Sequence, residues 1–227
     1  MVYLLDSRFR GNDRRCGKTN FEMGSNIFMK EIKQLKYTIL DGISEKQLKE
    51  HHDVLYAGYV KKWNEIQEKL ASVDRAQANA TYSDYGEMKR EETFALNGIK
   101  LHEGYFDNMA QGGSEPSGLV KQWIEKDFGS YEKWMEDFKA LGVAARGWAI
   151  LAFDLDEGKL YNYLCDSHNQ GGVWNSVPLF IMDVYEHAYF LDFATARKAY
   201  IEVFFKNIDW SAVSAVIEKF NLSQFRK

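Results

Sequence analysis

Cysteine and proline are both scarce in this chain of 227 residues, which contains two of each. Cys16 and Cys165 do not form a C-x-x-C pair, and two cysteines make no disulfide framework. A disulfide-rich secreted scaffold is therefore excluded, and the reducing cytoplasm is the predicted compartment. The two prolines, Pro116 and Pro178, leave most of the chain free to form long helices.

Long apolar runs and an excess of basic charge are also missing. No run approaches the roughly 18 apolar residues that a membrane-spanning helix needs, so we expect no membrane association. The formal net charge of −4 argues against a general role in binding nucleic acid, although it permits a local basic funnel for a small anion. A hydrophobic content of 45% is typical of a globular protein.

The beginning of the chain differs from the rest. Residues 1–15 are rich in Arg without helical or strand periodicity, and they lack the apolar core of about 7 to 15 residues of a secretory signal. A basic transit-like arm is the alternative interpretation. We predict a disordered extension at 1–36, an N-terminal helical domain at 37–112 and a C-terminal α/β domain at 113–227.

Two long helices are predicted in the N-terminal domain. The first begins after Ser44, an N-cap with Gln47 in the capping-box position, and apolar residues recur at helical spacing as far as Leu70. The second has an apolar face from Phe94 to Met109. A polar connection joins them, which predicts an antiparallel helical hairpin.

A linker rich in Gly, Ser and Pro at 111–118 precedes shorter elements. The following stretches read as helices or strands: helices at 119–125, 130–145, 194–206 and 212–220, and strands at 147–154, 159–165 and 178–183. The fold class is therefore α+β, with a long helical hairpin and a small antiparallel sheet flanked by helices.

The last predicted strand ends in a carboxylate. Asp183 follows the apolar run at 178–182, and His187 lies four residues further on. Because a buried carboxylate is unfavourable without a cation or several donors, the segment suggests a metal site. The alternative is an Asp that caps the next helix, followed by a surface His.

Further histidines could complete such a site. The chain contains five, and an antiparallel hairpin brings His51, early on the first helix, level with His102, late on the second. Three imidazoles and one carboxylate form a ligand set suited to Fe, Mn, Zn or Co. A Cys-rich structural zinc site is excluded.

Several motifs in the order seen here resemble the iron/manganese superoxide dismutase family, from about Tyr37 to Phe220. His51 lies eight residues before a Tyr-Val pair, and the family's D-x-W-E-H-A-Y-Y signature appears as DVYEHAYF at 183–190. The remaining matches are LHEGYF at 101–106, EPSG at 115–118, FGS at 128–130 and GWA at 147–149.

The resemblance implies a superoxide dismutase that converts superoxide to dioxygen and hydrogen peroxide at one Mn or Fe ion per subunit. The ligands it implies are His51, His102, Asp183 and His187. Tyr59 matches a tyrosine at the substrate channel that takes part in proton delivery.

Further residues carry over from the same resemblance. Gln170 matches the glutamine that hydrogen-bonds metal-bound solvent in manganese-type members, whereas the iron-type position for that glutamine is Gly98. This favours manganese over iron. Glu186 matches a residue that binds the partner subunit's His187, so we expect a homodimer with Glu186 and Tyr189 at its interface.

Some positions depart from the family pattern. Leu55 stands where a histidine is usual, Leu101 replaces Asn, and Ile150 and Tyr185 replace the usual Trp residues. These changes spare the ligands but alter their surroundings. They keep a second hypothesis open, that of a non-catalytic interaction protein with this fold. A non-haem iron oxygenase or metal hydrolase is disfavoured, because four protein ligands leave too few open positions.

Overall fold

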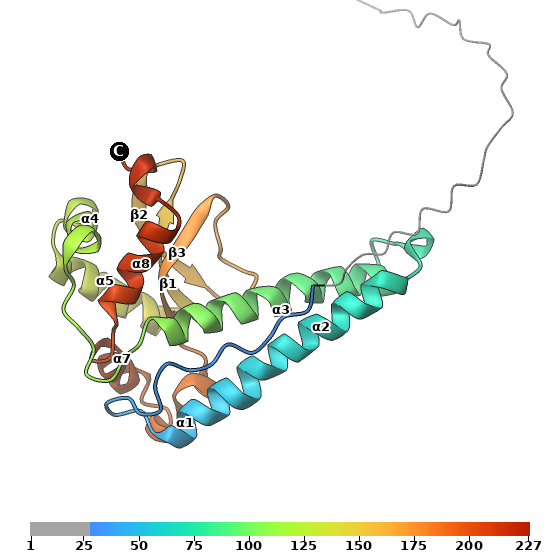
Figure 1. Cartoon of the computed structure of the whole chain (residues 1–227), viewed down its shortest axis with the longest axis horizontal. Helices are drawn as coiled ribbons and strands as arrows, with labels where there is room; N and C mark the ends of the chain where they lie inside the picture. Colours follow the sequence, from blue (N-terminus) through green and yellow to red (C-terminus); the bar gives the residue numbers. More distant parts are fainter. Residues whose placement is uncertain (1–27) are drawn as a thin grey trace, which may run out of the picture.

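The computed structural model describes residues 28–227, and the predicted α+β organisation is confirmed. Figure 1 shows two long helices running side by side and projecting from a part that contains a small sheet covered by shorter helices. Residues 1–27, and with them most of the predicted extension, lie outside the described residues. Among residues 28–227, no helix has the length and apolar character needed to cross a membrane.

The first predicted helix is interrupted by a π-helical segment. It consists of α1 (Glu45–Lys49), the π-helix η1 (Glu50–Tyr56) and α2 (Ala57–Ser72). The long partner α3 (Asp84–Asp107) follows the short η2 (Arg75–Gln77) and begins ten residues before the expected apolar face. Because π-helical turns are rare and concentrate at functional sites, η1 is of special interest.

The predicted capping box is only half formed. The Ser44 hydroxyl accepts a hydrogen bond from the Gln47 N–H at 3.1 Å. The reciprocal bond is replaced, because the Ser44 N–H donates to Asp192 at 2.7 Å and the Gln47 amide donates to the carbonyl of His187 at 2.6 Å. The start of the helix is thus tied to the C-terminal domain.

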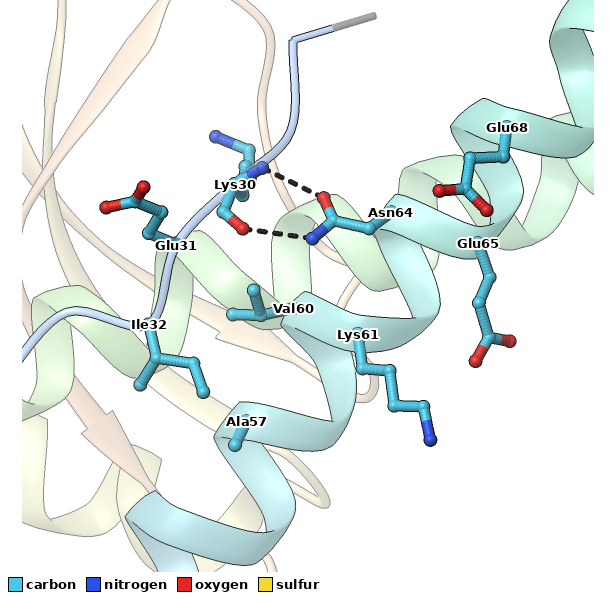
Figure 2. Close-up of a pocket in the computed structure, with 9 residues that line it drawn as sticks. All are labelled: Lys30, Glu31, Ile32, Ala57, Val60, Lys61, Asn64, Glu65 and Glu68. Carbon is cyan, nitrogen blue, oxygen red and sulfur yellow. Dashed lines mark hydrogen bonds between the residues drawn. The ribbon is translucent and has the colours of Figure 1, made fainter.

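Residues 28–36, part of the predicted extension, pack along α2. Figure 2 shows the Asn64 side chain bonding both the N–H and the C=O of Lys30, each at 2.9 Å. The Lys33 N–H donates to the Tyr56 hydroxyl at 2.9 Å. The groove beside these contacts, about 490 Å³ in volume, is lined by this segment and by α2.

The sheet has the order β2-β1-β3, and both pairings are antiparallel. The strands are β1 (Trp148–Asp154), β2 (Lys159–Cys165) and β3 (Ser176–Asp183), and β1 is buried along its whole length. Trp148 pairs with Asp183, so both lie at the same end of the sheet.

Four helices lie close to the predicted ranges: α4 (Gly118–Phe128), α5 (Tyr131–Ala144), α7 (Arg197–Phe205) and α8 (Trp210–Lys219). The one-turn helix α6 (Phe190–Phe193) and the 3-10 segments η3 (Glu186–Ala188) and η4 (Leu222–Phe225) were not predicted.

Close contacts join α3 to β3. A Cβ atom on Gly104 would lie 2.4 Å from the Cδ1 of Ile181, so only glycine allows this approach. Just after α3, the Asn108 side chain accepts the Ile181 N–H at 2.8 Å. These contacts bring the end of α3, which carries His102, against the strand that ends at Asp183.

Candidate metal centre

Four predicted ligands from four different elements meet at one point. One ligand atom each from His51, His102, Asp183 and His187 lies within 4.8 Å of the others. His51 comes from η1, His102 from α3, Asp183 from the end of β3, and His187 from η3.

Asp183 stands at the centre of this cluster and is fully buried. Its Oδ2 lies 3.1 Å from the Nε2 of His51, 3.2 Å from that of His187 and 3.7 Å from that of His102. Its Oδ1 accepts the Tyr185 N–H at 2.9 Å. One carboxylate oxygen is therefore oriented by the backbone, and the other faces three imidazoles.

The nitrogen of His102 that faces the cluster shows that these residues fit a metal ion. Its Nδ1 lies 2.6 Å from the carbonyl of Gly98, so Nδ1 carries the proton and Nε2 a lone pair. Nε2 is buried and has no hydrogen-bond partner within residues 28–227. Leaving such an acceptor unsatisfied costs about 1–3 kcal/mol, whereas a metal ion would use the lone pair.

Electrostatics hold three members of the cluster, His51, His102 and Asp183, in protonation states suited to a cation. Burial and the neighbouring His51 lower the pKa of His102 to about 3, and burial likewise lowers the pKa of His51. Burial alone would raise the pKa of Asp183, but attraction by His187 and His51 holds that pKa well below its usual range. Neutral imidazoles and an ionised carboxylate are the ligand forms that metals require.

The π-helical segment separates two adjacent histidines. His51 enters the cluster, whereas His52 faces away from it: the Nδ1 of His52 lies 2.7 Å from Asp53 and its Nε2 lies 2.8 Å from the carbonyl of Lys33. His51 rather than His52 therefore belongs to the cluster, in agreement with the motif spacing.

Comparison with known proteins agrees with this geometry. Residues 116–216 match the family described as "Iron/manganese superoxide dismutases, C-terminal domain". An iron superoxide dismutase of Aquifex aeolicus is 46% identical over 189 residues, which cover 82% of this chain and 89% of the relative. This chain belongs to the iron/manganese superoxide dismutase family.

Other relatives in this superoxide dismutase family carry both metal names. A manganese superoxide dismutase of Haloferax volcanii is 39% identical, with 78% of this chain and 88% of the relative covered. An iron superoxide dismutase of Cupriavidus metallidurans is 38% identical, with 75% of this chain and 86% of the relative covered.

Tyr59 and His168 lie beside the ligands of this superoxide dismutase family member. The Tyr59 ring is centred 5.3 Å from that of His102 and 4.7 Å from that of His168. Burial, with the charges of Tyr185 and Asp183, raises the pKa of Tyr59 to about 12. The phenol is therefore protonated at neutral pH.

His168 has a defined tautomer. Its Nδ1 is 3.0 Å from the Nε1 of Trp148, and an indole N–H can only donate. Burial lowers the pKa of His168 to about 4, so the ring is neutral and its single proton sits on Nε2. His168 is thus a fixed N–H donor next to the cluster.

The structure does not bring Gln170 to the cluster. Its side chain is exposed, and its backbone N–H bonds the carbonyl of Ser167 at 3.4 Å. The alternative position is also closed, because a Cβ on Gly98 would lie 2.9 Å from Tyr59 and 3.3 Å from His168. His168, rather than Gln170, is the residue of this loop whose ring lies beside a ligand, centred 5.7 Å from that of His102. Two signals pointed to His168: it is one of the five histidines, and it lies two residues before Gln170.

Tyr189 also lies elsewhere than expected. It is only 2% exposed within its own chain, and its hydroxyl accepts a hydrogen bond from Arg197 at 3.1 Å. Its ring is covered by this chain, which leaves it little surface for a partner subunit. Phe190 beside it is 47% exposed, and Glu186 is also exposed in this single chain.

Sequence reasoning missed the groups that support the ligands. The Tyr200 hydroxyl donates to the carbonyl of Asp183 at 2.7 Å and lies 3.2 Å from the Tyr105 hydroxyl. Such outer partners orient metal ligands. A single sequence does not reveal these partners, because a buried Tyr in a supporting role has the same sequence pattern as a Tyr that only fills the hydrophobic core.

We predict that His187→Ala abolishes metal binding, because it removes one of four ligands from a site that the chain preorganises. His52→Ala is the matched control. It removes an imidazole next to a ligand and should keep one metal per chain. Metal content after dialysis measures both. Full metal retention by His187→Ala would contradict the ligand assignment.

The binding of metal should release a proton from His187 at pH 6.5. Burial lowers the pKa of His187, but attraction by Asp183 and the hydrogen bond that His187 donates to it outweigh burial, and the net pKa is raised. Metal must displace the proton that His187 then carries. Affinity should therefore fall as the pH decreases through a range that lies above the ordinary histidine value of about 6.5. Calorimetry in two buffers of different ionisation enthalpy counts the protons. Zero protons released at pH 6.5 would contradict the raised pKa.

Proposed function

We propose that this protein is a superoxide dismutase that holds one Mn or Fe ion through His51, His102, His187 and Asp183. The observation that carries the proposal is the buried, unpartnered Nε2 of His102 facing Asp183, in a chain of this family. The metal, when bound, supplies one-electron oxidation and reduction of superoxide. Dioxygen and hydrogen peroxide are the products.

Side chains near the site serve proton transfer and orientation. Peroxide formation consumes two protons, and Tyr59 holds a phenolic proton at neutral pH beside His102 and His168. His168 presents its Nε2–H as a fixed donor, because Trp148 occupies its Nδ1. Both donors are set in place before substrate arrives, which lowers the cost of reorganisation during the reaction.

The choice of metal depends on the residues around the ligands. Preference for manganese rested on Gln170, whose side chain is exposed. A histidine donor from the same loop takes its place, and relatives are named for iron and for manganese. We therefore propose that either metal supports activity in this site, whose nitrogen and oxygen ligands suit both ions.

The decisive test is superoxide consumption per bound metal, on samples reconstituted separately with Mn and with Fe. Both forms should turn over, with metal quantified in the same sample. One bound metal per chain without turnover in either form would instead support the second hypothesis, a non-catalytic interaction protein. The altered surroundings, including the partly exposed Leu55, are what favour that alternative.

The reassignment from Gln170 to His168 has its own test. His168→Ala should lower turnover per metal by roughly a hundredfold to a thousandfold, the range seen for loss of one preorganised donor. Gln170→Ala should leave it unchanged, because that side chain faces solvent. Turnover per metal for both variants decides the point. A large loss in Gln170→Ala alone would restore the original assignment.

A homodimer and a cytoplasmic location complete the proposal. Glu186 is exposed close to His187 in sequence, which supports a contact with the partner subunit's His187. Phe190 replaces Tyr189 in our proposed interface, since it is the exposed aromatic ring. The cytoplasm remains the predicted compartment, because Cys165 is a free, buried thiol.

A further inference from the structure

A second cavity is lined by α3, by all three strands and by His168, and none of the four ligands lines it. It has a volume of about 380 Å³, within the range of roughly 300–1,000 Å³ seen for small-molecule sites. Its lining includes Ile150 and Leu101, two of the positions at which this chain departs from its family pattern. An Ile side chain occupies less space than the Trp of that pattern. The cavity in this chain therefore includes space that a Trp side chain at position 150 would fill.

The cavity is apolar at its base and carries polar groups at its rim. Leu101, Ile150 and Ala152 form buried apolar surface, 9%, 6% and 1% exposed. Asn97 and Lys100 line it from one side of α3, and Asn169 lines it from the loop after β2. This combination suits a ligand with an apolar body and one polar end.

The charge of the cavity lining indicates the chemistry of the ligand's polar end. Lys100 is the only Lys, Arg, Asp or Glu residue that lines the cavity, and it forms no ion pair within residues 28–227. His168 is neutral, as its low pKa indicates. A single unpaired ammonium flanked by amide donors is complementary to a single carboxylate.

Trp174 indicates the shape of the ligand's apolar part. Its side chain lines the cavity and yet is 93% exposed, the highest value among the large apolar residues described. An indole left in water at the rim of an apolar cavity offers a flat face on which an aromatic ring can stack.

We propose that this cavity binds a small planar aromatic carboxylate, with its ring between Trp174 and the Ile150 floor and its carboxylate at Lys100. The site is distinct from the metal cluster, because none of the four ligands lines it. His168 lines the cavity and also lies beside His102, with the two rings centred 5.7 Å apart.

Benzoate is the probe, titrated into metal-loaded full-length protein and followed by calorimetry and tryptophan fluorescence. We expect saturable binding at one site per chain, with benzamide, its neutral analogue, binding more weakly. Lys100→Gln should raise the Kd of benzoate by about threefold to tenfold and leave that of benzamide unchanged, because it removes only the charge. Absence of saturable benzoate binding would overturn the proposal.

Ile150→Trp fills the cavity from its floor and should abolish the binding of both probes. Its thermal unfolding and metal content show whether the variant is folded, and Lys100→Gln, on the surface, provides an independent test. Equal benzoate affinity in Ile150→Trp and the parent protein would overturn the site. So would binding that requires the metal, or a change of oligomeric state in Trp174→Ala without loss of benzoate affinity, which would assign the surface to a second copy of the chain.

Discussion

The burial of one carboxylate among three imidazoles is the interaction on which the rest of the structure depends. Asp183 has no exposed surface, and its Oδ2 faces His51, His102 and His187. Leaving a buried charge without its partner is worth about 3–5 kcal/mol against folding, so the elements that carry the imidazoles must meet at this point. The same attraction keeps Asp183 ionised, as a metal ligand must be, and it raises the pKa of His187, whose proton a metal ion has to displace.

This constraint explains why neither half of the molecule forms the site alone. The hairpin supplies His51 and His102, and the C-terminal part supplies Asp183 and His187. Contacts away from the cluster set the distance between them. The close packing at Gly104, the bond from Ile181 to Asn108 and the bond from Gln47 to the carbonyl of His187 hold the two halves together. The geometry of the ligands is therefore a property of the interface between the two halves.

The four ligands agree with the family pattern, whereas several residues around them depart from it. His168, held by Trp148, lies beside the ligand His102, whereas the side chain of Gln170 is exposed. Motif matching selects this loop but not the residue that faces the ligands, because a loop that turns over a few residues can direct any of them inwards. Tyr189 is a similar case: its place in the signature is clear from sequence, but only the structure shows that it is buried in its own chain.

The sequence by itself determined the element types, their order, the α+β class and the four ligands, because hydrophobic periodicity, caps and motif spacing are local properties. The π-helical segment that turns His51 inwards and His52 outwards was decided only by tertiary packing against the preceding segment and α3. Packing also decided the tautomer of His168 and the cavity beside Ile150. Each depends on atoms distant in sequence that are brought within a few ångströms, and a local pattern carries no record of such distances.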